Sequence, residues 1–261
     1  MKNIKMIFFD VDGTLVPLDK DDISDKSVFA LNKLQENGIK ICVATGRAPI
    51  QLPKFRGINF DVYLNFNGSL VFNEIEDIFK NPLSKKNIFT LLENGKAMDK
   101  PLAVASKKIY ACNGTNPDLK EYFSFGGEVS QKFMKILKNL LNEEIYQAIL
   151  PIKENEYGKA MNNVLTTKIA AWWDRAVDLI PKNGGKGRAI EEVLSFYNIK
   201  KDECMAFGDG NNDLEMFESV KYGICMENGS GNLKNISYYV CKSIDGDGVY
   251  YNFRKIYKVL Y

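Results

Sequence analysis

The stretch Met6-Ile7-Phe8-Phe9-Asp10-Val11-Asp12-Gly13-Thr14 decides how this 261-residue chain folds. Its first four residues are all large and apolar, which is typical of a strand that is buried on both faces of a parallel sheet. Acidic residues follow at once, so the apolar run is too short for a signal peptide or a membrane span. The stretch therefore predicts a core strand with carboxylates at its carboxyl end.

The same pattern of a short apolar run recurs along the chain, and amphipathic helices separate the runs. We expect helices over residues 24–37 and 187–197, because each places apolar side chains on one face. Alternation of strand and helix predicts an α/β fold with a Rossmann-like, doubly wound parallel sheet. The further core strands are expected at residues 39–44, 62–66, 204–207, 222–226 and 238–241.

The middle of the chain has a different pattern, in which strand-like runs cluster and helices interrupt them. Such clustering predicts a separate α+β domain, and Pro and Gly residues at both flanks are typical of connectors. We therefore expect a core of residues 1–81 and 182–261 with an inserted domain of residues 82–181. Within the insertion we expect helices at 84–94 and 129–141 and strands at 102–106, 109–112, 145–150 and 164–171.

Composition excludes several classes of function. The 35 basic and 33 acidic residues give a net charge of only +2, and no basic run is present, so neither nucleic acid nor a membrane is an expected partner. The chain contains no histidine, which excludes Ser-His-Asp and Cys-His catalysis. The five cysteines are scattered, and we expect them to be buried thiols of a cytoplasmic protein.

Polar residues gather directly after four of the predicted strands. Because the carboxyl ends of parallel strands share one edge of a sheet, these segments are expected to line one crevice at the topological switch point. The four segments are Asp10-Val11-Asp12-Gly13-Thr14, Thr45-Gly46-Arg47, Asn67-Gly68 and Gly208-Asp209-Gly210-Asn211-Asn212-Asp213.

The charges in this crevice predict a divalent cation. Asp10, Asp12, Asp209 and Asp213 would repel one another by about 4 kcal/mol per close pair at an effective dielectric constant of about 20. Lys186 is the clearest cation in reach. Oxygen ligands without His or Cys favour Mg²⁺, and glycine-rich loops with free backbone amides favour a bound phosphate.

Asp10 and Asp12 are two residues apart, so in an extended chain both side chains project to the same side. One carboxylate could then attack a phosphorus atom, while the other, kept protonated by like-charge repulsion, protonates the leaving oxygen. This division of labour would replace the missing histidine.

With these residues described, the chain resembles the haloacid dehalogenase superfamily of phosphatases, in particular the Cof-type subclass IIB with its large α+β cap domain. Asp10 to Leu15 matches the first family motif, Thr45-Gly46-Arg47 the second, Lys186 the third, and Gly208 to Asp213 the fourth. The resemblance covers the core and, by its placement and length, the inserted domain as a substrate-selecting cap.

The resemblance implies a role for each motif residue. Asp10 would be the nucleophile that forms an aspartyl-phosphate, and Asp12 the general acid and base. Mg²⁺ would be held by Asp10, Asp209 and the main-chain carbonyl of Asp12. The residues that would bind the substrate phosphate are Thr45, Gly46, Arg47, Asn67 and Lys186, and those that would support the metal from behind are Asn212 and Asp213.

The expected activity is Mg²⁺-dependent hydrolysis of a small phosphorylated metabolite, with sugar phosphates first, by a monomer or small homo-oligomer. A phosphomutase on the same scaffold and a non-catalytic phosphate or Mg²⁺ sensor remain as alternatives. Arg47 could contact the substrate or the inserted domain, or it could equally form a surface ion pair. Trp172 and Trp173 follow the strand expected at 164–171 directly. Because neighbouring residues of an extended chain face opposite sides, only one of them could line the cleft, and packing in the core of the inserted domain is favoured over stacking on a sugar.

Overall fold

The computed structural model describes residues 3–20, 22–124 and 143–257, and the chain divides into two compact units. The first unit comprises Met1–Gly46, Pro53–Phe79 and Lys186–Tyr261, and the second comprises Arg47–Leu52 and Lys80–Gly185. These junctions differ by a few residues from the expected bounds at 81/82 and 181/182. The short segment Arg47–Leu52 groups with the second unit, which the sequence did not indicate.

The first unit is built on an eight-stranded sheet in the order β13-β12-β11-β1-β2-β3-β4-β5. The strands from β13 to β3 are parallel, whereas β4 pairs antiparallel with β3. The predicted α/β class with a doubly wound parallel sheet is confirmed, and an antiparallel edge extends it. The strands are β1 Met6–Phe9, β2 Lys40–Ala44, β3 Val62–Asn65, β4 Leu70–Phe72, β5 Asp77–Lys80, β11 Cys204–Gly208, β12 Tyr222–Cys225 and β13 Tyr239–Val240.

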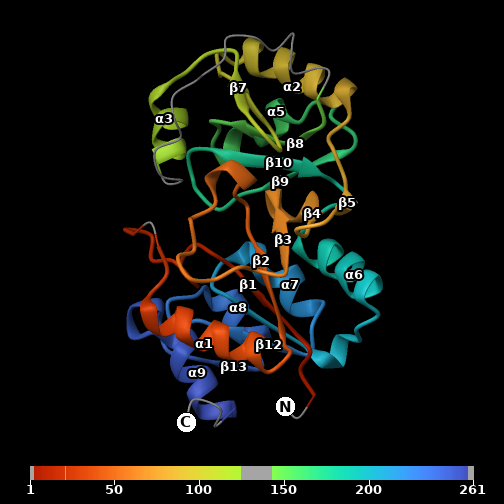
Figure 1. Ribbon diagram of the computed structural model, residues 1–261. Helices are drawn as coiled ribbons and strands as arrows, with labels where there is room; N and C mark the ends of the chain where they lie inside the picture. Colours follow the sequence, from red (N-terminus) through yellow and green to blue (C-terminus); the bar gives the residue numbers. More distant parts are fainter. Residues whose placement is uncertain (1–2, 21, 125–142, 258–261) are drawn as a thin grey trace. The chain divides into compact units, whose positions relative to one another are not determined.

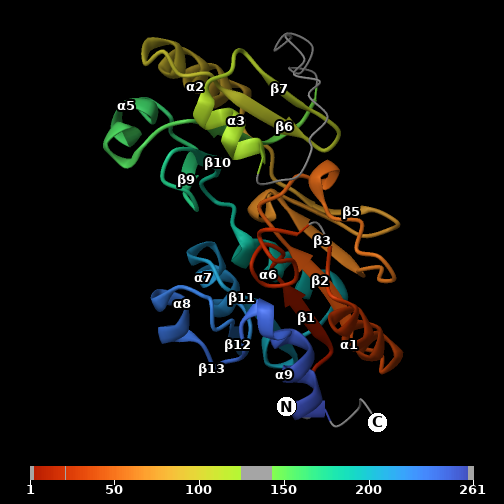
Figure 2. The same cartoon turned by 90° about the vertical axis from the view of Figure 1, so that its left-hand side faces the viewer.

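Strand β1 lies in the middle of this sheet, between β2 and β11 (Figure 2). On one face Met6 and Phe8 belong to an apolar cluster that includes side chains from the helix at residues 186–197. On the other face the ring of Phe9 stacks on Phe207, with centroids 5.2 Å apart, and meets Phe253 edge-on. Helices thus cover both faces, which explains why β1 is apolar at every position.

Helix α1 of the first unit begins at a side-chain cap that also ties it to the C-terminal helix. The Ser24 hydroxyl accepts a hydrogen bond from the Ser27 amide at 3.2 Å and donates one to the Asp247 carboxylate at 2.9 Å. Lys26 pairs with the same carboxylate at 2.8 Å. Helices α1 and α9 lie side by side (Figure 1). The helices of this unit are α1 Asp25–Glu36, α6 Lys186–Tyr197, α7 Leu214–Glu218, α8 Gly231–Ile236 and α9 Gly248–Tyr257.

The second unit contains an antiparallel five-stranded sheet in the order β7-β6-β8-β10-β9. Helix α2 covers one face with Ile88, Leu91 and Leu92, which pack with apolar residues of β6, β8 and β10. The elements are α2 Lys85–Ala97, β6 Ala103–Ser106, β7 Tyr110–Cys112, α3 Pro117–Ser124, β8 Ile145–Leu150, α5 Tyr157–Ala160, β9 Thr167–Ala170 and β10 Val177–Pro181.

The two tryptophans of the second unit lie outside its strands. The structure places Trp172 and Trp173 in a turn after β9 rather than on a strand, and Trp172 is 46% exposed. The expectation of a packed core was therefore wrong for Trp172, because β9 ends at Ala170 and the segment that follows lies at the surface, where the Trp172 ring contacts those of Tyr122 and Trp173. The helix expected at 129–141 lies outside the described residues.

All five cysteines are free thiols, and four of them are buried. A search of the described ranges for a helix both long and apolar enough to cross a membrane found none.

Candidate active site

The ends of four neighbouring strands bring the predicted polar segments to one edge of the first unit's sheet. The backbone pairing of the strands continues one residue beyond each: the Asp10 amide donates to the Phe207 carbonyl and the Thr45 amide to the Leu64 carbonyl, both at 2.9 Å. The Asn67 amide in turn donates to the Thr45 carbonyl at 2.9 Å. The segments after β1, β2 and β3 therefore lie next to one another, with the segment after β11 on the other side of β1.

A buried lysine joins two of the acidic segments. Lys186, the first residue of α6, places its Nζ 2.6 Å from an oxygen of Asp10 and 2.6 Å from an oxygen of Asp213. The side chains of Lys186 and Asp213 are fully buried, and that of Asp10 is 8% exposed. Burial disfavours the charge on the lysine, but its two carboxylate partners outweigh burial and hold the pKa of Lys186 above its usual value.

Close packing of α6 on α7 permits this ion pair. A Cβ atom on Gly187 would lie only 2.7 Å from the carbonyl oxygen of Glu215, so only glycine allows the helices to approach at this point. The approach brings the start of α6, with Lys186, to Asp213, which immediately precedes α7.

Asp213 uses both of its carboxylate oxygens within the protein. One oxygen pairs with Lys186, and the other accepts hydrogen bonds from the amides of Asp209 and Gly210, each at 3.0 Å. It therefore orders the loop that carries Asp209. This arrangement fits the supporting position expected for Asp213 behind the metal.

Asp209 is held from the loop that follows β1. The Thr14 hydroxyl donates to one of its oxygens at 2.9 Å, and Thr14 itself is fully buried. Gly13 has a φ of +83°, and a Cβ atom there would come within 2.4 Å of the other oxygen. A glycine is thus required both for the backbone conformation and for the close approach of the carboxylate.

The donor set fits a divalent cation. Asp10, Asp209 and Asp213 offer one oxygen atom each, and these atoms lie within 4.8 Å of one another. Lys186 pairs with Asp10 and Asp213, so the three carboxylates of this group face one ammonium, which leaves a surplus of negative charge in a largely buried site. Hard oxygen ligands of this kind suit Mg²⁺ rather than zinc or copper.

The same surplus shifts the carboxyl pKa values of the protein without a cation. Burial, followed by the charge of Asp213, raises the pKa of Asp209 from 3.8 to about 7. Burial also raises the pKa of Asp10 well above its usual value, and nearby carboxylates add to this while Lys186 opposes it. A bound cation would favour the ionised forms and reverse these shifts.

Asp12 is half-buried, and its charge contributes to the raised pKa of both Asp10 and Asp209. The carboxylates close enough to share a cation, however, are those of Asp10, Asp209 and Asp213. The Asp12 carboxylate lies outside that group, and the contribution expected from Asp12 to the metal is its main-chain carbonyl.

The residues expected to bind phosphate fall in two groups. Thr45 is fully buried, and Gly46 lies against the side chain of Asn67, whose Nδ2 would be 3.2 Å from a Cβ at that glycine. Arg47 instead belongs to the second unit, where its guanidinium donates to the Gln51 carbonyl at 3.0 Å. Asn212 is half-buried in the turn Asn211–Asp213.

Sequence reasoning overlooked two contacts at this site. One is the hydrogen bond that the Thr14 hydroxyl donates to Asp209. The other is Asn228, whose side chain donates to the Gly13 carbonyl at 2.9 Å. Asn228 follows β12, and the run Met226-Glu227-Asn228-Gly229-Ser230 at that strand end was the available signal.

A cluster of carboxylates around a buried lysine, at the carboxyl ends of the strands of a doubly wound sheet, is the arrangement that points to the class. The chain belongs to the haloacid dehalogenase-like hydrolases, whose family model matches residues 7–253. Within that class it is a phosphatase, a phosphoric monoester hydrolase, and the resemblance to the Cof-type, subclass IIB members is confirmed.

Three similar proteins illustrate the relationship. YkrA of Bacillus subtilis (strain 168), whose name describes it provisionally as a phosphatase, is 30% identical over 256 residues, or 97% of each chain. The 5-amino-6-(5-phospho-D-ribitylamino)uracil phosphatase YbjI of Escherichia coli (strain K12) is 24% identical, over 95% of this chain and 94% of its own. The solved structure of the HAD subclass IIB sugar phosphatase BT4131 superposes with a TM-score of 0.83 at 25% identity, covering 98% of this chain and 99% of its own.

Proposed function

We propose that this phosphatase hydrolyses small phosphorylated metabolites with Mg²⁺ through a phosphorylated Asp10. The observation that carries the proposal is the buried cluster in which the Nζ of Lys186 lies 2.6 Å from an oxygen of Asp10 and 2.6 Å from an oxygen of Asp213. Asp209 lies close enough to Asp10 and Asp213 for the three carboxylates to share one metal ion. The free thiols of the chain suit a reducing cytoplasm, in which we place the enzyme.

In the first step an oxygen of Asp10 attacks the phosphorus atom, and the bond from phosphorus to the leaving oxygen breaks. Asp12 donates a proton to that leaving oxygen, and the dephosphorylated product departs as an alcohol. Lys186 orients Asp10 and places positive charge beside it. Thr45, with the backbone at Gly46, would hold the phosphate oxygens.

In the second step a water molecule attacks the phosphorus of the aspartyl-phosphate. Asp12, now ionised, accepts a proton from the water, and cleavage of the bond between phosphorus and Asp10 releases inorganic phosphate. Mg²⁺ held by Asp10, Asp209 and the Asp12 carbonyl would supply neutralisation of the carboxylate and phosphate charges. The second unit would act as the cap that selects the leaving group.

We propose phosphate esters on hydroxylated carbon chains as the substrate class. YbjI is named for a phosphoribityl compound and BT4131 for sugar phosphates, and both kinds of substrate carry the ester on such a chain. The shared chemistry makes hexose, pentose and ribityl phosphates the first candidates.

A phosphate-release assay over these esters, nucleotides and cofactor phosphates tests the proposal. We expect turnover with Mg²⁺, none after treatment with EDTA, and recovery when Mg²⁺ is restored. Turnover that persists in EDTA would contradict the metal assignment. An isomerised sugar phosphate without free phosphate would indicate a mutase, and tight binding without turnover would indicate a sensor.

A further inference from the structure

We propose that Asn228 is a positioning residue that holds the loop of Asp10 and Asp12 and the loop of Asp209 at the separation that the metal site requires. The inference rests on the proposed function, because it concerns the same site. Asn228 belongs to neither acidic loop, since it follows β12, two strands away from β1.

Both ends of the Asn228 amide contact other segments. Its Nδ2 donates to the Gly13 carbonyl at 2.9 Å and lies 3.5 Å from an oxygen of Asp209. Its Oδ1 accepts a hydrogen bond from the Ile244 amide at 3.1 Å. One side chain thereby connects the loop after β1, the loop after β11 and the segment before α9.

The backbone around Asn228 is itself attached to the end of β11. The Met226 amide donates to the Gly208 carbonyl at 3.0 Å, and the Ser230 amide donates to the Asp209 carbonyl at 2.8 Å. A Cβ atom at Gly229 would come within 3.1 Å of that same Asp209 oxygen. The loop after β12 is thus attached to the Asp209 loop by backbone hydrogen bonds. The side-chain amide of Asn228 connects this loop to the loop after β1.

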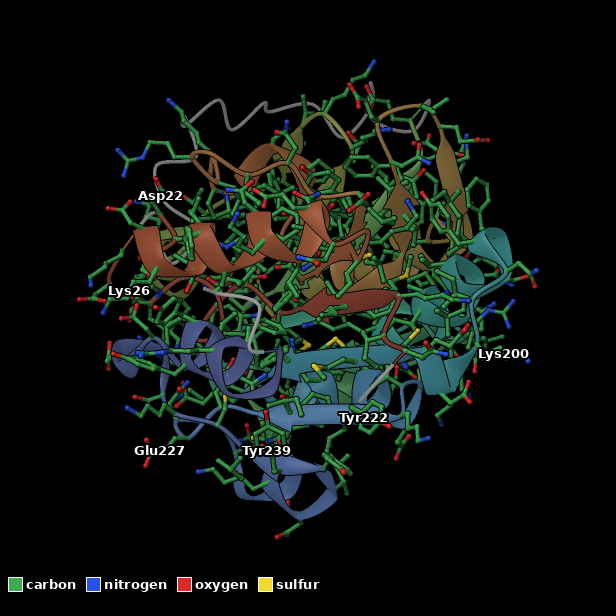
Figure 3. The ribbon with its side chains drawn as sticks, turned by 60° about the horizontal axis from the view of Figure 1, so that its bottom comes forward. Asp22, Lys26, Lys200, Tyr222, Glu227 and Tyr239 are labelled. Carbon is green, nitrogen blue, oxygen red and sulfur yellow. The ribbon has the colours of Figure 1, made fainter. Side chains whose placement is uncertain are left out.

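Packing does not explain these contacts. Asn228 is exposed, and the preceding residue, Glu227, extends outward at the surface (Figure 3). An exposed side chain whose two amide atoms both reach distant segments is suited to fixing geometry rather than to filling a core. Mutation of a residue that hydrogen-bonds to metal ligands typically lowers metal affinity or activity by about 10–100-fold, which corresponds to about 1.4–2.7 kcal/mol.

The test compares Mg²⁺ binding by the unmodified full-length protein with that of two variants, by isothermal titration in phosphate-free buffer. Asn228→Ala removes the link, and the matched control Asn235→Ala removes an exposed asparagine of α8. We expect Asn228→Ala to weaken Mg²⁺ binding by about tenfold or more, with no change for Asn235→Ala. The Mg²⁺ concentration for half-maximal hydrolysis of p-nitrophenyl phosphate should rise in parallel, and the Tm of the metal-free protein should stay unchanged.

Equal Mg²⁺ affinity in Asn228→Ala and the unmodified protein would overturn the inference, and so would a weakened affinity accompanied by a large fall in the metal-free Tm. If the unmodified protein binds Mg²⁺ but hydrolyses no ester, the proposed function fails, while the comparison of affinities still decides the role of Asn228. If it binds no Mg²⁺, both are overturned.

Discussion

At the scale of single residues, the acidic cluster separates Asp10 from Asp12. Asp10 pairs with Lys186 and belongs to the group of carboxylates that could share a cation, whereas the Asp12 carboxylate lies outside that group. We therefore expect the two aspartates to have different tasks, which substitution of each can separate.

Asp10→Asn should abolish turnover, because the amide is a poor nucleophile, while the fold is retained. Asp12→Asn should slow turnover by about 10²–10⁴-fold, because proton transfer is lost but Asp10 can still be phosphorylated. Mass spectrometry of the quenched enzyme should show a phosphorylated species for Asp12→Asn and none for Asp10→Asn. More than a few per cent of residual activity in Asp10→Asn would refute its assignment as nucleophile.

Gly13→Ala should remove Mg²⁺ binding as well as some stability. The new Cβ would collide with Asp209 at 2.4 Å, and φ is +83°. Gly38 is the matched control, since its φ is +76° and nothing lies within 4 Å of a Cβ there. We expect both substitutions to cost about 1 kcal/mol or more in urea unfolding, but only Gly13→Ala should weaken Mg²⁺ binding in calorimetry. Equal Mg²⁺ affinity in the two variants would contradict the role of Gly13.

At the scale of elements, helix starts and close helix contacts position the site. Helix α6 begins at its functional lysine, and Gly187 lets it approach α7 and Asp213. Helix α1 carries no pocket residue, but its first turn is tied to Asp247 ahead of α9. Its cap should therefore affect stability without affecting catalysis.

Ser24→Ala should lower the free energy of unfolding by about 1 kcal/mol for the lost cap, and further for the lost hydrogen bond to Asp247. Ser84→Ala is the matched control, because Ser84 caps α2 by the same bond, at 3.2 Å to the Asn87 amide. Urea titrations should show the larger loss for Ser24→Ala, with kcat unchanged. A loss for Ser24→Ala no greater than for Ser84→Ala would show that the Asp247 bond contributes nothing.

Most of the elements could be predicted from the sequence, because apolar runs and caps are local signals. The predicted strand at residues 6–9 coincides with β1, and the predicted helix at 24–37 with α1. Strands β4, β5 and β10 were missed. Strand β4 has only three residues, β5 has a charged residue at each end and no buried position, and β10 ends in a proline that favours a connector.

Part of the candidate site could also be predicted from the sequence, and part could not. The segments after the strands follow from topology, so the meeting of Asp10, Asp209 and Asp213 was predictable. Lys186 begins α6, and it was expected at the site from the charge balance and the family motif. For Arg47, a contact with the inserted domain was one of the alternatives left open, and Arg47 groups with the second unit. The contacts of Asn228 could not be predicted, because they depend on tertiary structure with no local signature.

At the scale of the whole molecule, the absence of histidine simplifies the response to pH. Between pH 5 and 7 the shifted carboxyls of the pocket dominate, with Asp209 titrating at about 7. The pKa of Asp209 is higher in the folded protein than in the unfolded chain, so between these two values the metal-free folded protein binds a proton that the unfolded chain has released. Its stability should therefore fall as pH rises from about 4 to 7.

Mg²⁺ binding should reverse this trend, because the cation competes with that proton. We expect Mg²⁺ to raise Tm more at pH 7.5 than at pH 5.5, and its affinity to weaken by about tenfold or more at the lower pH. Thermal scans with and without Mg²⁺ at both values provide the check. A shift in Tm that is independent of pH would contradict the raised pKa of Asp209.

The places where the chain passes from one unit to the other have an evolutionary consequence. Two of these four crossings adjoin pocket residues, since Gly46 follows Thr45 at one and Lys186 opens the first unit again at another. An exchange of the second unit for one with a different specificity would have to add no residues at the junctions after Gly46 and Gly185. Insertions at the crossings after Leu52 and Phe79 would be tolerated more readily, so lineages should vary in length there.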